Sequence, residues 1–366
     1  MTALILRYLI VAVVAGSLAT PANAQTTTVT DVLDRTVEIP ENPQRILLGF
    51  YFEDFFAVGG PDAYDRVVAI SREAWEGWRN QQWKAYAAAV PRIAEVTDVG
   101  EVDSGTFSLE AALATRPDVA LIADWQYTAL GDTVGRLEAA GVPVVVLDYN
   151  AQTVDRHVAS TRALGKVLGI EDRAQALADL YAGAVADVRA RVSEAEARPK
   201  VHFELGNKGA DEPGFSWGDV MWGRLVEVAG GTNIAKDKVA KWAPVEPEYV
   251  LAQKPDFVFL AGSGWLGRDN VVLLGPGVDA ETTHARMAPY LQRPGWAELP
   301  AVKQDRVFGV YHGGTRTLYD FTFLQFIAKA LHPDLFADVD PQKNLEDFFD
   351  QYMPIKATGT YMTQMP

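Results

Sequence analysis

Two segments of the 366-residue chain, 138 positions apart (248 minus 110), have almost the same sequence. The first begins at Glu110 and reads Glu-Ala-Ala-Leu-Ala-Thr-Arg-Pro-Asp-Val; the second begins at Glu248 and reads Glu-Tyr-Val-Leu-Ala-Gln-Lys-Pro-Asp-Phe. Each segment places a glutamate in the first turn of a short helix, ends that helix at a basic residue and Pro-Asp, and continues into an apolar strand (119–123 and 257–261). The repeat predicts two copies of one design, with a cleft between two similar lobes.

The sequence around each copy predicts alternating strands and helices. The first copy opens with a β-ribbon over 32–39, a buried strand over 45–49 and a helix over 52–58 that ends at two glycines. The second opens with a strand over 200–205 and a helix over 221–229, again ended by two glycines. Strand–helix–strand order is typical of parallel sheets. We therefore expect an α/β fold of two Rossmann-like lobes with mainly parallel sheets.

The stretch between the lobes is rich in alanine, leucine, arginine and glutamate, and only Gly165, Gly169 and Gly183 interrupt it. It predicts a long connecting helix, which would limit the lobes to modest closure around a ligand. The predicted division of the chain is a signal peptide (1–24), an N-terminal lobe (25–152), a helical connector (153–198) and a C-terminal lobe (199–366).

The N-terminus has the pattern of an export signal. Arg7 precedes an apolar run over 8–19, and Ala22-Asn23-Ala24 has the small-x-small form of a signal-peptidase site, so we expect cleavage after Ala24. Twelve apolar residues are fewer than the roughly 20 that a membrane-spanning helix needs. The chain has no cysteine, and both a lipid-anchored N-terminus and a thiolate metal site need one, so we expect neither. We expect a periplasmic protein with no membrane insertion after cleavage.

The acidic composition restricts the partners. Loss of Arg7 with the signal peptide changes the formal net charge from -15 to -16. Such a surface disfavours nucleic acid and anionic lipid, which attract clustered positive charge. Local arginines in a cleft can still hold an anionic ligand. We expect a monomer that binds a small molecule.

The signal peptide, the cysteine-free chain, the paired Glu…Pro-Asp motifs and the helical connector together resemble the helical-backbone class (class III) of periplasmic substrate-binding proteins. These proteins serve ABC importers of iron-siderophores, haem, cobalamin and some metal ions. Residues 49–56 (Gly-Phe-Tyr-Phe-Glu-Asp-Phe-Phe) and 70–78 (Ile-Ser-Arg-Glu-Ala-Trp-Glu-Gly-Trp) are similar to the iron-complex branch. The resemblance implies a ferric-iron complex such as an Fe(III)-siderophore as ligand, no built-in cofactor, and an ABC permease dimer in the inner membrane as partner. It also implies that Glu110 and Glu248 pair with arginines on that permease.

Candidate ligand-binding residues lie in the loops that follow predicted strands, because ligands of open α/β sheets bind at the carboxyl ends of the strands. These loops combine aromatic rings with arginines, which suits a bulky, partly apolar, anionic ferric chelate. The resemblance implies that the loop after the first strand enters the cleft, which makes Tyr51 a candidate. The candidates are Tyr51, Arg72, Trp75, Trp78, Trp125, Tyr127, Asn207, Trp217, Trp242, Trp265, His312, Arg316 and Tyr319.

Other ligands stay open at this point. A small oxyanion such as molybdate or tungstate would suit Arg72, Arg316 and backbone N–H groups, and haem would suit Tyr51 or His312 as an axial ligand. Cobalamin and a bare metal ion are further alternatives. No two of the five histidines have a chelating i, i+4 spacing, which disfavours a divalent-metal site. An Fe(III) site built from tyrosines (Tyr51, Tyr127, Tyr149, Tyr311) would require those side chains to converge.

An enzyme is a more distant alternative. The chain has no His-Glu-x-x-His or phosphate-loop signature. These absences disfavour an exported hydrolase, and the chain is expected to be a binding protein.

Overall fold

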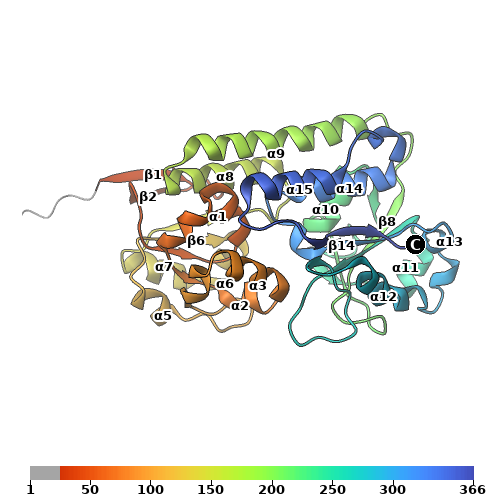
Figure 1. The fold of residues 1–366 in the computed structure, drawn as a ribbon, viewed down its shortest axis with the longest axis horizontal. Helices are drawn as coiled ribbons and strands as arrows, with labels where there is room; N and C mark the ends of the chain where they lie inside the picture. Colours follow the sequence, from red (N-terminus) through yellow and green to blue (C-terminus); the bar gives the residue numbers. More distant parts are fainter. Residues whose placement is uncertain (1–24) are drawn as a thin grey trace, which may run out of the picture.

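The computed structural model describes residues 25–366, so the predicted signal peptide lies outside the described residues. Figure 1 shows two lobes side by side, each built around a sheet, with long helices running along one side of both. The predicted α/β fold with mainly parallel sheets in two lobes is confirmed.

The N-terminal lobe contains a five-stranded parallel sheet in the order β5-β4-β3-β6-β7. Its strands are β3 (Ile46–Leu48), β4 (Val67–Ile70), β5 (Thr97–Asp98), β6 (Val119–Ala123) and β7 (Val144–Leu147). Every residue of β3, β6 and β7 is buried. This explains their continuous apolar sequences, since helices cover both faces of a parallel sheet.

The C-terminal lobe contains a second five-stranded sheet in the order β10-β8-β12-β14-β16. Its strands are β8 (Lys200–Leu205), β10 (Thr232–Asn233), β12 (Phe257–Gly262), β14 (Val307–Tyr311) and β16 (Met362–Gln364). Only β16, at one edge, is antiparallel to its neighbour. The run β10-β8-β12-β14 repeats the order of β4-β3-β6-β7, as expected for two copies of one design.

The other strands of the described chain form three short antiparallel pairs. They are β1 (Thr26–Thr30) with β2 (Thr36–Pro40), β9 (Phe215–Trp217) with β11 (Trp242–Pro244), and β13 (Gly275–Pro276) with β15 (Gly359–Thr360). The ribbon expected over 32–39 is therefore displaced. Residues 31–35 form its turn, because the Asp31 carboxylate accepts the backbone N–H groups of Leu33 and Arg35.

Helices surround both sheets. In the N-terminal lobe they are α1 (Phe52–Gly59), α2 (Arg72–Glu76), α3 (Asn80–Ala89), α4 (Arg92–Glu95), α5 (Leu109–Ala114), α6 (Asp124–Leu130) and α7 (Asp132–Ala139). In the C-terminal lobe they are α10 (Met221–Val228), α11 (Pro247–Gln253), α12 (Ala280–Leu291), α13 (Pro300–Lys303), α14 (Asp320–Leu331) and α15 (Pro341–Tyr352). Short 3₁₀ turns complete the chain: η1 (Pro61–Arg66), η2 (Trp296–Glu298), η3 (His312–Gly314) and η4 (Pro333–Phe336). No helix within residues 25–366 is both long and apolar enough to cross a membrane.

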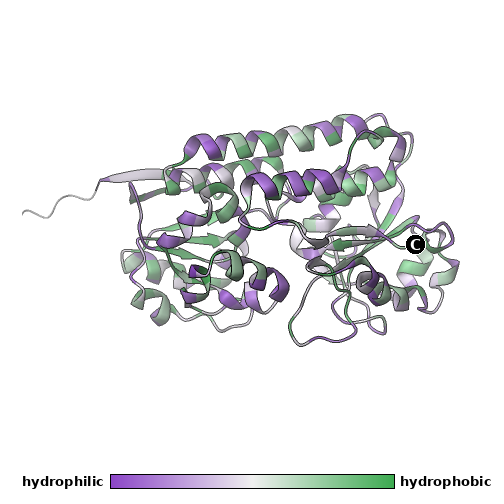
Figure 2. Cartoon of the chain, in the orientation of Figure 1, coloured by the Kyte–Doolittle hydropathy of each residue, from purple (hydrophilic) through white to green (hydrophobic). Residues whose placement is uncertain are grey.

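The connector consists of two helices, α8 (Val154–Leu168) and α9 (Glu171–Val192), instead of one continuous helix. Gly169 ends α8 in the left-handed conformation, with φ of 71°, which glycine adopts without a steric penalty. The 22-residue α9 runs along both lobes beside α14 and α15 (Figure 1). In Figure 2 the long helices alternate green and purple, as expected for helices with one buried face.

One hydrophobic cluster extends from the N-terminal lobe through α8 and α9 into the C-terminal lobe. It includes Phe55 of α1, Leu164 of α8, Val185 of α9 and Phe323 of α14. The lobes are therefore joined by continuous core packing on the connector side, which opposes a wide hinge motion.

Candidate functional site

A cavity of about 260 Å³ lies between the two lobes, where loops leave the carboxyl ends of the parallel strands. Six aromatic side chains line it: Trp78, Trp125, Phe215, Trp217, Trp242 and Trp265. The charged and imidazole side chains at its wall are Arg79, Asp103, Arg268, His312 and Arg316, and the remaining lining residues are Asn150, Leu205, Asn207, Met221 and Ser263.

The structure brings eight of the thirteen predicted ligand-binding residues together around this cavity. They are Trp78, Trp125, Asn207, Trp217, Trp242, Trp265, His312 and Arg316. Both lobes contribute to this set, as the cleft between two copies requires.

The other five predicted residues lie elsewhere, each engaged within the protein. Trp75 is fully buried and stacks on Phe52, Tyr127 lies under the guanidinium of Arg35, and Arg72 donates to the carbonyls of Ala94 and Val96. The Tyr319 hydroxyl donates to Glu53 at 2.6 Å. The Tyr51 hydroxyl donates to Asn150 Oδ1 at 2.9 Å and accepts the backbone N–H of Tyr149 at 3.1 Å. Tyr51 thus fixes the position of Asn150, which lines the cavity.

Several lining residues were not among the sequence candidates, notably Arg79, Asp103, Asn150, Phe215 and Arg268. Asn150 lies three residues after the end of β7, so the strand-end rule that selected the other residues could have found it. Arg79 stands next to Trp78 in the chain, and its position could have been added to the same loop. Arg268 lies three residues after the candidate Trp265, in the long connection that follows β12.

The cavity has an excess of positive charge although the chain is acidic. Three arginines line it against one carboxylate, that of Asp103. The guanidinium carbons of Arg79 and Arg316 lie 5.2 and 5.0 Å from the ring centre of Phe50. One nitrogen of each, Nη2 of Arg79 and Nε of Arg316, is buried without a hydrogen-bond partner among the described residues. Two neighbouring guanidinium groups with poorly compensated charge indicate a site for an anion.

The environment of Arg316 makes its positive charge costly. Protein surrounds the side chain, although part of its surface stays open to the cavity. Burial, followed by repulsion from Arg79, lowers the pKa of Arg316 to about 9. The guanidinium is therefore still protonated at pH 7 but poorly compensated, and an anion in the cavity would compensate it.

His312 offers a donor to the cavity. Its Nδ1 accepts the indole N–H of Trp222 at 3.1 Å, and an indole nitrogen can only donate. Burial, followed by the charges of Arg316 and Arg79, lowers the pKa of His312 well below its usual value, so the ring is neutral at pH 7. A neutral ring with an accepting Nδ1 carries its proton on Nε2. Nε2 thus presents an N–H and no lone pair for a metal ion.

The lobes also touch beside the cavity, at a place that we call the front contact (residues 77–81 with 263–266). The backbone N–H of Asn80 donates to the carbonyl of Gly264 at 3.1 Å, and that of Leu266 donates to Gly77 at 3.3 Å. A Cβ on Gly264 would overlap the side-chain amide of Gln81, so glycine permits this close approach. Backbone hydrogen bonds dominate the front contact, whereas the connector side is packed core.

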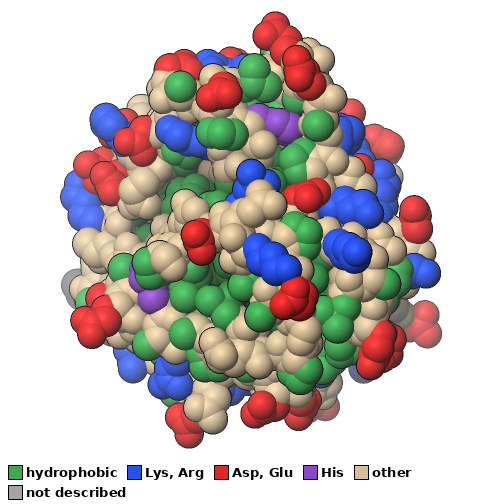
Figure 3. Space-filling view, turned by 90° about the vertical axis from the view of Figure 1, so that its right-hand side faces the viewer, with side chains coloured by type: hydrophobic (Ala, Val, Ile, Leu, Met, Phe, Trp, Pro, Cys, Tyr) green, Lys and Arg blue, Asp and Glu red, His purple; other side chains and the backbone are tan. Residues whose placement is uncertain are grey.

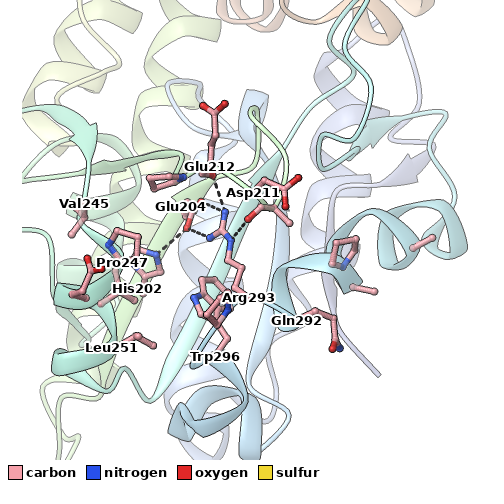
Figure 4. A pocket seen from close by; sticks show the side chains of 18 residues that line it. His202, Glu204, Asp211, Glu212, Val245, Pro247, Leu251, Gln292, Arg293 and Trp296 are labelled. Carbon is pink, nitrogen blue, oxygen red and sulfur yellow. Dashed lines mark hydrogen bonds and ion pairs between the residues drawn. The ribbon is translucent and has the colours of Figure 1, made fainter.

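A larger cavity, of about 950 Å³, lies within the C-terminal lobe between the loop at 210–213, α11 and the end of α12. Figure 3 faces this end of the molecule and shows apolar side chains exposed in hollows among charged ones. In Figure 4, Arg293 reaches Glu204 and the neighbouring loop. Its guanidinium donates to both Glu204 oxygens at 2.8 and 2.9 Å and to the carbonyls of Ala210 and Glu212 at 2.6 and 2.9 Å. Because this charge is already paired, the cavity lacks the uncompensated donors of the interlobe site.

The Arg293–Glu204 pair predicts a specific dependence of stability on pH. Burial alone would raise the pKa of Glu204, but hydrogen bonds and charges from His202 and Arg293 outweigh burial and lower it to about 2. A depressed carboxyl pKa stabilises the fold above the unfolded value near 4.5, and this contribution is lost as pH falls through about 2. We expect Arg293→Ala to lower the free energy of unfolding by about 3 kcal/mol at pH 7 and by progressively less below pH 4.5. Urea denaturation at several pH values measures this.

The matched control is Lys303→Ala, which removes an exposed ion pair with Glu298 and should change stability little at any pH. A constant loss for Arg293→Ala between pH 7 and pH 3 would contradict the assignment of the pH dependence to Glu204.

The two repeated glutamates occupy equivalent positions. Glu110 and Glu248 are exposed in the first turns of α5 and α11. Ser108 caps α5 by accepting the N–H of Ala111, and Glu248 stands at the rim of the larger cavity. Both carboxylates are therefore free to meet a partner protein, one from each lobe.

Direct metal ligation has little support within residues 25–366, where no three His, Asp or Glu side chains cluster as metal ligands would. Tyr51 and Tyr149 are neighbours, with ring centres 4.9 Å apart, but burial raises the pKa of each well above 10. Phenolates are thus disfavoured at the place where two of the four tyrosines approach each other.

Comparison with known proteins identifies the family. Residues 47–311 match the periplasmic binding protein family. The crystal structure of the TroA-like periplasmic binding protein FepB from Veillonella parvula is 31% identical, covers 93% of this chain and 99% of that one, and superposes with a TM-score of 0.86. The molybdate-binding protein MolA from Haemophilus influenzae is 23% identical over 95% of this chain and 96% of its own. An uncharacterized ABC transporter substrate-binding lipoprotein, YvrC from Bacillus subtilis, is 22% identical over 85% and 87%.

The chain belongs to the periplasmic binding protein family. Its relatives are substrate-binding proteins of ABC transporters, which implies a permease partner and a periplasmic location. The interlobe cavity is the part of this structure that could hold a transported ligand.

Proposed function

We propose that the protein captures an anionic ferric chelate, such as an Fe(III)-siderophore, between its lobes and delivers it to an ABC permease. The observation that carries the proposal is the pair Arg79 and Arg316, two neighbouring and poorly compensated guanidinium groups that line the cavity together with six aromatic rings. Guanidinium groups match carboxylate or catecholate oxygens, and aromatic rings pack against an organic shell. A bare metal ion would use neither feature.

The iron would be held by its chelator and the chelator by the protein. His312 supplies an N–H to the ligand, and its Nδ1 is occupied by Trp222. For the same reason, axial ligation of haem by His312 would require the loss of that hydrogen bond. We also propose that the protein acts as a monomer and that the export signal is cleaved after Ala24, which would leave no cysteine for lipid attachment.

The size of the cavity favours a compact chelate. At roughly 30 Å³ per water molecule, 260 Å³ holds about nine waters, which lies just below the ~300 to 1,000 Å³ of pockets for drug-sized ligands. The periphery of a larger chelate would project past Trp242, whose surface is 43% exposed. Such a ligand would leave part of its shell in water.

The proposal is tested by titrating the mature protein with ferric carboxylate and catecholate siderophores, haem, cobalamin, molybdate and divalent metal ions while following tryptophan fluorescence. The expected result is saturable quenching by a ferric chelate. This quenching should be lost on replacing Arg79 with Gln and kept on replacing the partly exposed Arg92, outside the cavity, with Gln. Binding of free divalent metal alone would overturn the proposal.

Molybdate is the second candidate, and the small volume of the cavity together with the two arginines favours it. The relative MolA is named as a molybdate-binding protein. A tetrahedral oxyanion would bind between Arg79, Arg316 and the His312 N–H, with most of the aromatic wall left against water. Saturation by molybdate and by no ferric chelate would select this candidate.

We propose further that Glu110 and Glu248 dock the protein on its permease. Reversing both charges (Glu110→Lys with Glu248→Lys) should abolish uptake by cells and leave the affinity for the ligand unchanged, because both residues are exposed and outside the cavity. The control pair Glu41→Lys with Glu196→Lys makes the same change of net charge at other exposed sites. Normal uptake by the first pair would refute the docking role.

A further inference from the structure

Arg316 has an unusual backbone conformation for a residue of its kind. Its φ is 69°, in the left-handed region that favours glycine. A side chain with a Cβ is strained there and stays only where its surroundings fix it, a situation typical of ligand sites. The surroundings of this residue therefore indicate how the anion site is built.

The loop that carries Arg316 follows β14 of the C-terminal lobe, yet groups of the N-terminal lobe hold it. The Leu318 N–H donates to Asp54 Oδ1 at 2.7 Å, and the Tyr319 hydroxyl donates to Glu53 Oε2 at 2.6 Å. Glu53 and Asp54 lie side by side on α1, and both are buried. Two bonds from one helix thus fix the loop on the C-terminal side of Arg316.

The other side of Arg316 is fixed in the same way. Gln152, which follows β7, donates from Nε2 to Thr315 Oγ1 at 3.0 Å, and both side chains are buried. Gln152 is itself in the left-handed region, with φ of 55°. Where the loop ends, at the first residue of α14, Oδ2 of Asp320 is hydrogen-bonded to Nε2 of His157 in α8 at 3.0 Å. The loop is therefore anchored on the N-terminal lobe and the connector both before and after Arg316.

We infer that Asp54, Glu53 and Gln152 are positioning residues that hold Arg316 in its strained conformation beside Arg79, so that the anion site moves with the N-terminal lobe. The inference rests on the proposed function of that site. Its consequence is that the two guanidinium groups are assembled before a ligand arrives. Lobe closure then adds the aromatic wall of the C-terminal lobe to a preformed anion site and does not create the site.

Matched substitutions separate positioning from general stability. Thr315→Val and Asp54→Ala each remove one acceptor, whereas Thr315→Ser and Asp54→Asn keep it. Asparagine is a fair mimic because burial, together with the nearby Glu53 and Asp320, raises the pKa of Asp54 well above its usual value. Thr315→Val is the safer variant, because it changes shape least.

The first measurement is a crystal structure of Thr315→Val and of Asp54→Ala without ligand. We expect the φ of residue 316 to leave the left-handed region in at least the Asp54→Ala protein, and to stay near 69° in Thr315→Ser and Asp54→Asn. An unchanged φ in both acceptor-free variants would overturn the inference. This result does not depend on which ligand the protein carries.

The second measurement is affinity for molybdate and for ferric citrate by tryptophan fluorescence. We expect about tenfold weaker binding of whichever probe binds for Thr315→Val and Asp54→Ala, recovered in Thr315→Ser and Asp54→Asn. In an Arg316→Gln background the same substitutions should cause no further loss, since they act through Arg316. Equal losses of affinity in the wild-type and Arg316→Gln backgrounds would overturn the inference. A wild-type protein that binds neither probe would contradict the proposed function, and the crystal structures would then decide the positioning role.

Discussion

Arg316→Met is expected to make the unliganded protein more stable and at the same time to weaken binding of an anionic ligand by about a hundredfold. The guanidinium is largely enclosed and lies beside Arg79, and these two causes lower its pKa to about 9, well below the usual value of an arginine. Replacing a poorly compensated buried charge with an apolar side chain typically stabilises a fold by about 1 to 2 kcal/mol. Methionine keeps the length of the side chain and the same backbone requirement, so the change isolates the charge.

The stability difference between the wild type and Arg316→Met should change with pH in a defined direction. The pKa of Arg316 in the folded protein is below its value in the unfolded chain, so above about pH 9 the unfolded chain binds more protons and folding becomes more favourable as pH rises. The stability advantage of Arg316→Met is thus full at pH 7 and narrows above pH 9. Urea denaturation at pH 7 and pH 10, with ligand titration at pH 7, measures both effects.

Arg92→Met is the control, because Arg92 is partly exposed and its Nη1 lies 3.9 Å from a carboxylate oxygen of the exposed Glu95. It should change neither stability nor affinity appreciably. A less stable Arg316→Met protein at pH 7 would contradict the view that the cavity holds an uncompensated charge, and unchanged affinity would remove Arg316 from the site.

The sequence was sufficient to predict the architecture because the duplicated motif constrains topology. Two copies of helix, Pro-Asp and strand require two sheets, and the matching order of β4-β3-β6-β7 and β10-β8-β12-β14 follows from that duplication. The break at Gly169 was visible as a glycine, but only its left-handed backbone shows that it ends a helix, whereas Gly165 and Gly183 stay within helices.

The site was predicted less completely, because a strand-end loop specifies where a residue is and not where its side chain points. Trp78 and Trp75 are three residues apart, yet the first faces the cavity and the second stacks on Phe52. Tyr51 and Tyr319 reach the region of the cleft but point to Asn150 and Glu53. Arg79 was missed because its importance comes from its closeness to Arg316. The sequence does not show that positions 79 and 316 lie side by side.

The two connections between the lobes differ in chemistry. The connector side contains apolar core and buried side-chain hydrogen bonds, including Asp54 with Leu318, which resist separation. The front contact relies on two backbone hydrogen bonds and one from the Ser263 hydroxyl to the Trp78 carbonyl, which water can replace once the contact opens. Ligand exchange is therefore expected to open the front contact while the connector side stays closed.

Locking the front contact with a disulfide is expected to slow both entry and release of the ligand at least a hundredfold. The three nearest atoms that a Cβ on Gly264 would meet all belong to the Gln81 side chain, so Gln81→Cys with Gly264→Cys removes the overlap and places two short thiol side chains at adjoining positions, where we expect a disulfide to form. The natural chain has no cysteine, so no competing pair can form.

The exchange of ligand is measured by dialysis. Protein oxidised with molybdate or ferric citrate bound should retain the ligand, protein oxidised empty should fail to take the ligand up, and dithiothreitol should restore exchange in both. The single variant Gln81→Cys, carried through the same steps, controls for loss of the glutamine. Equal exchange rates in the oxidised and reduced double variant would place the path of the ligand elsewhere, because a covalent bond across residues 81 and 264 leaves only the other openings of the cavity free.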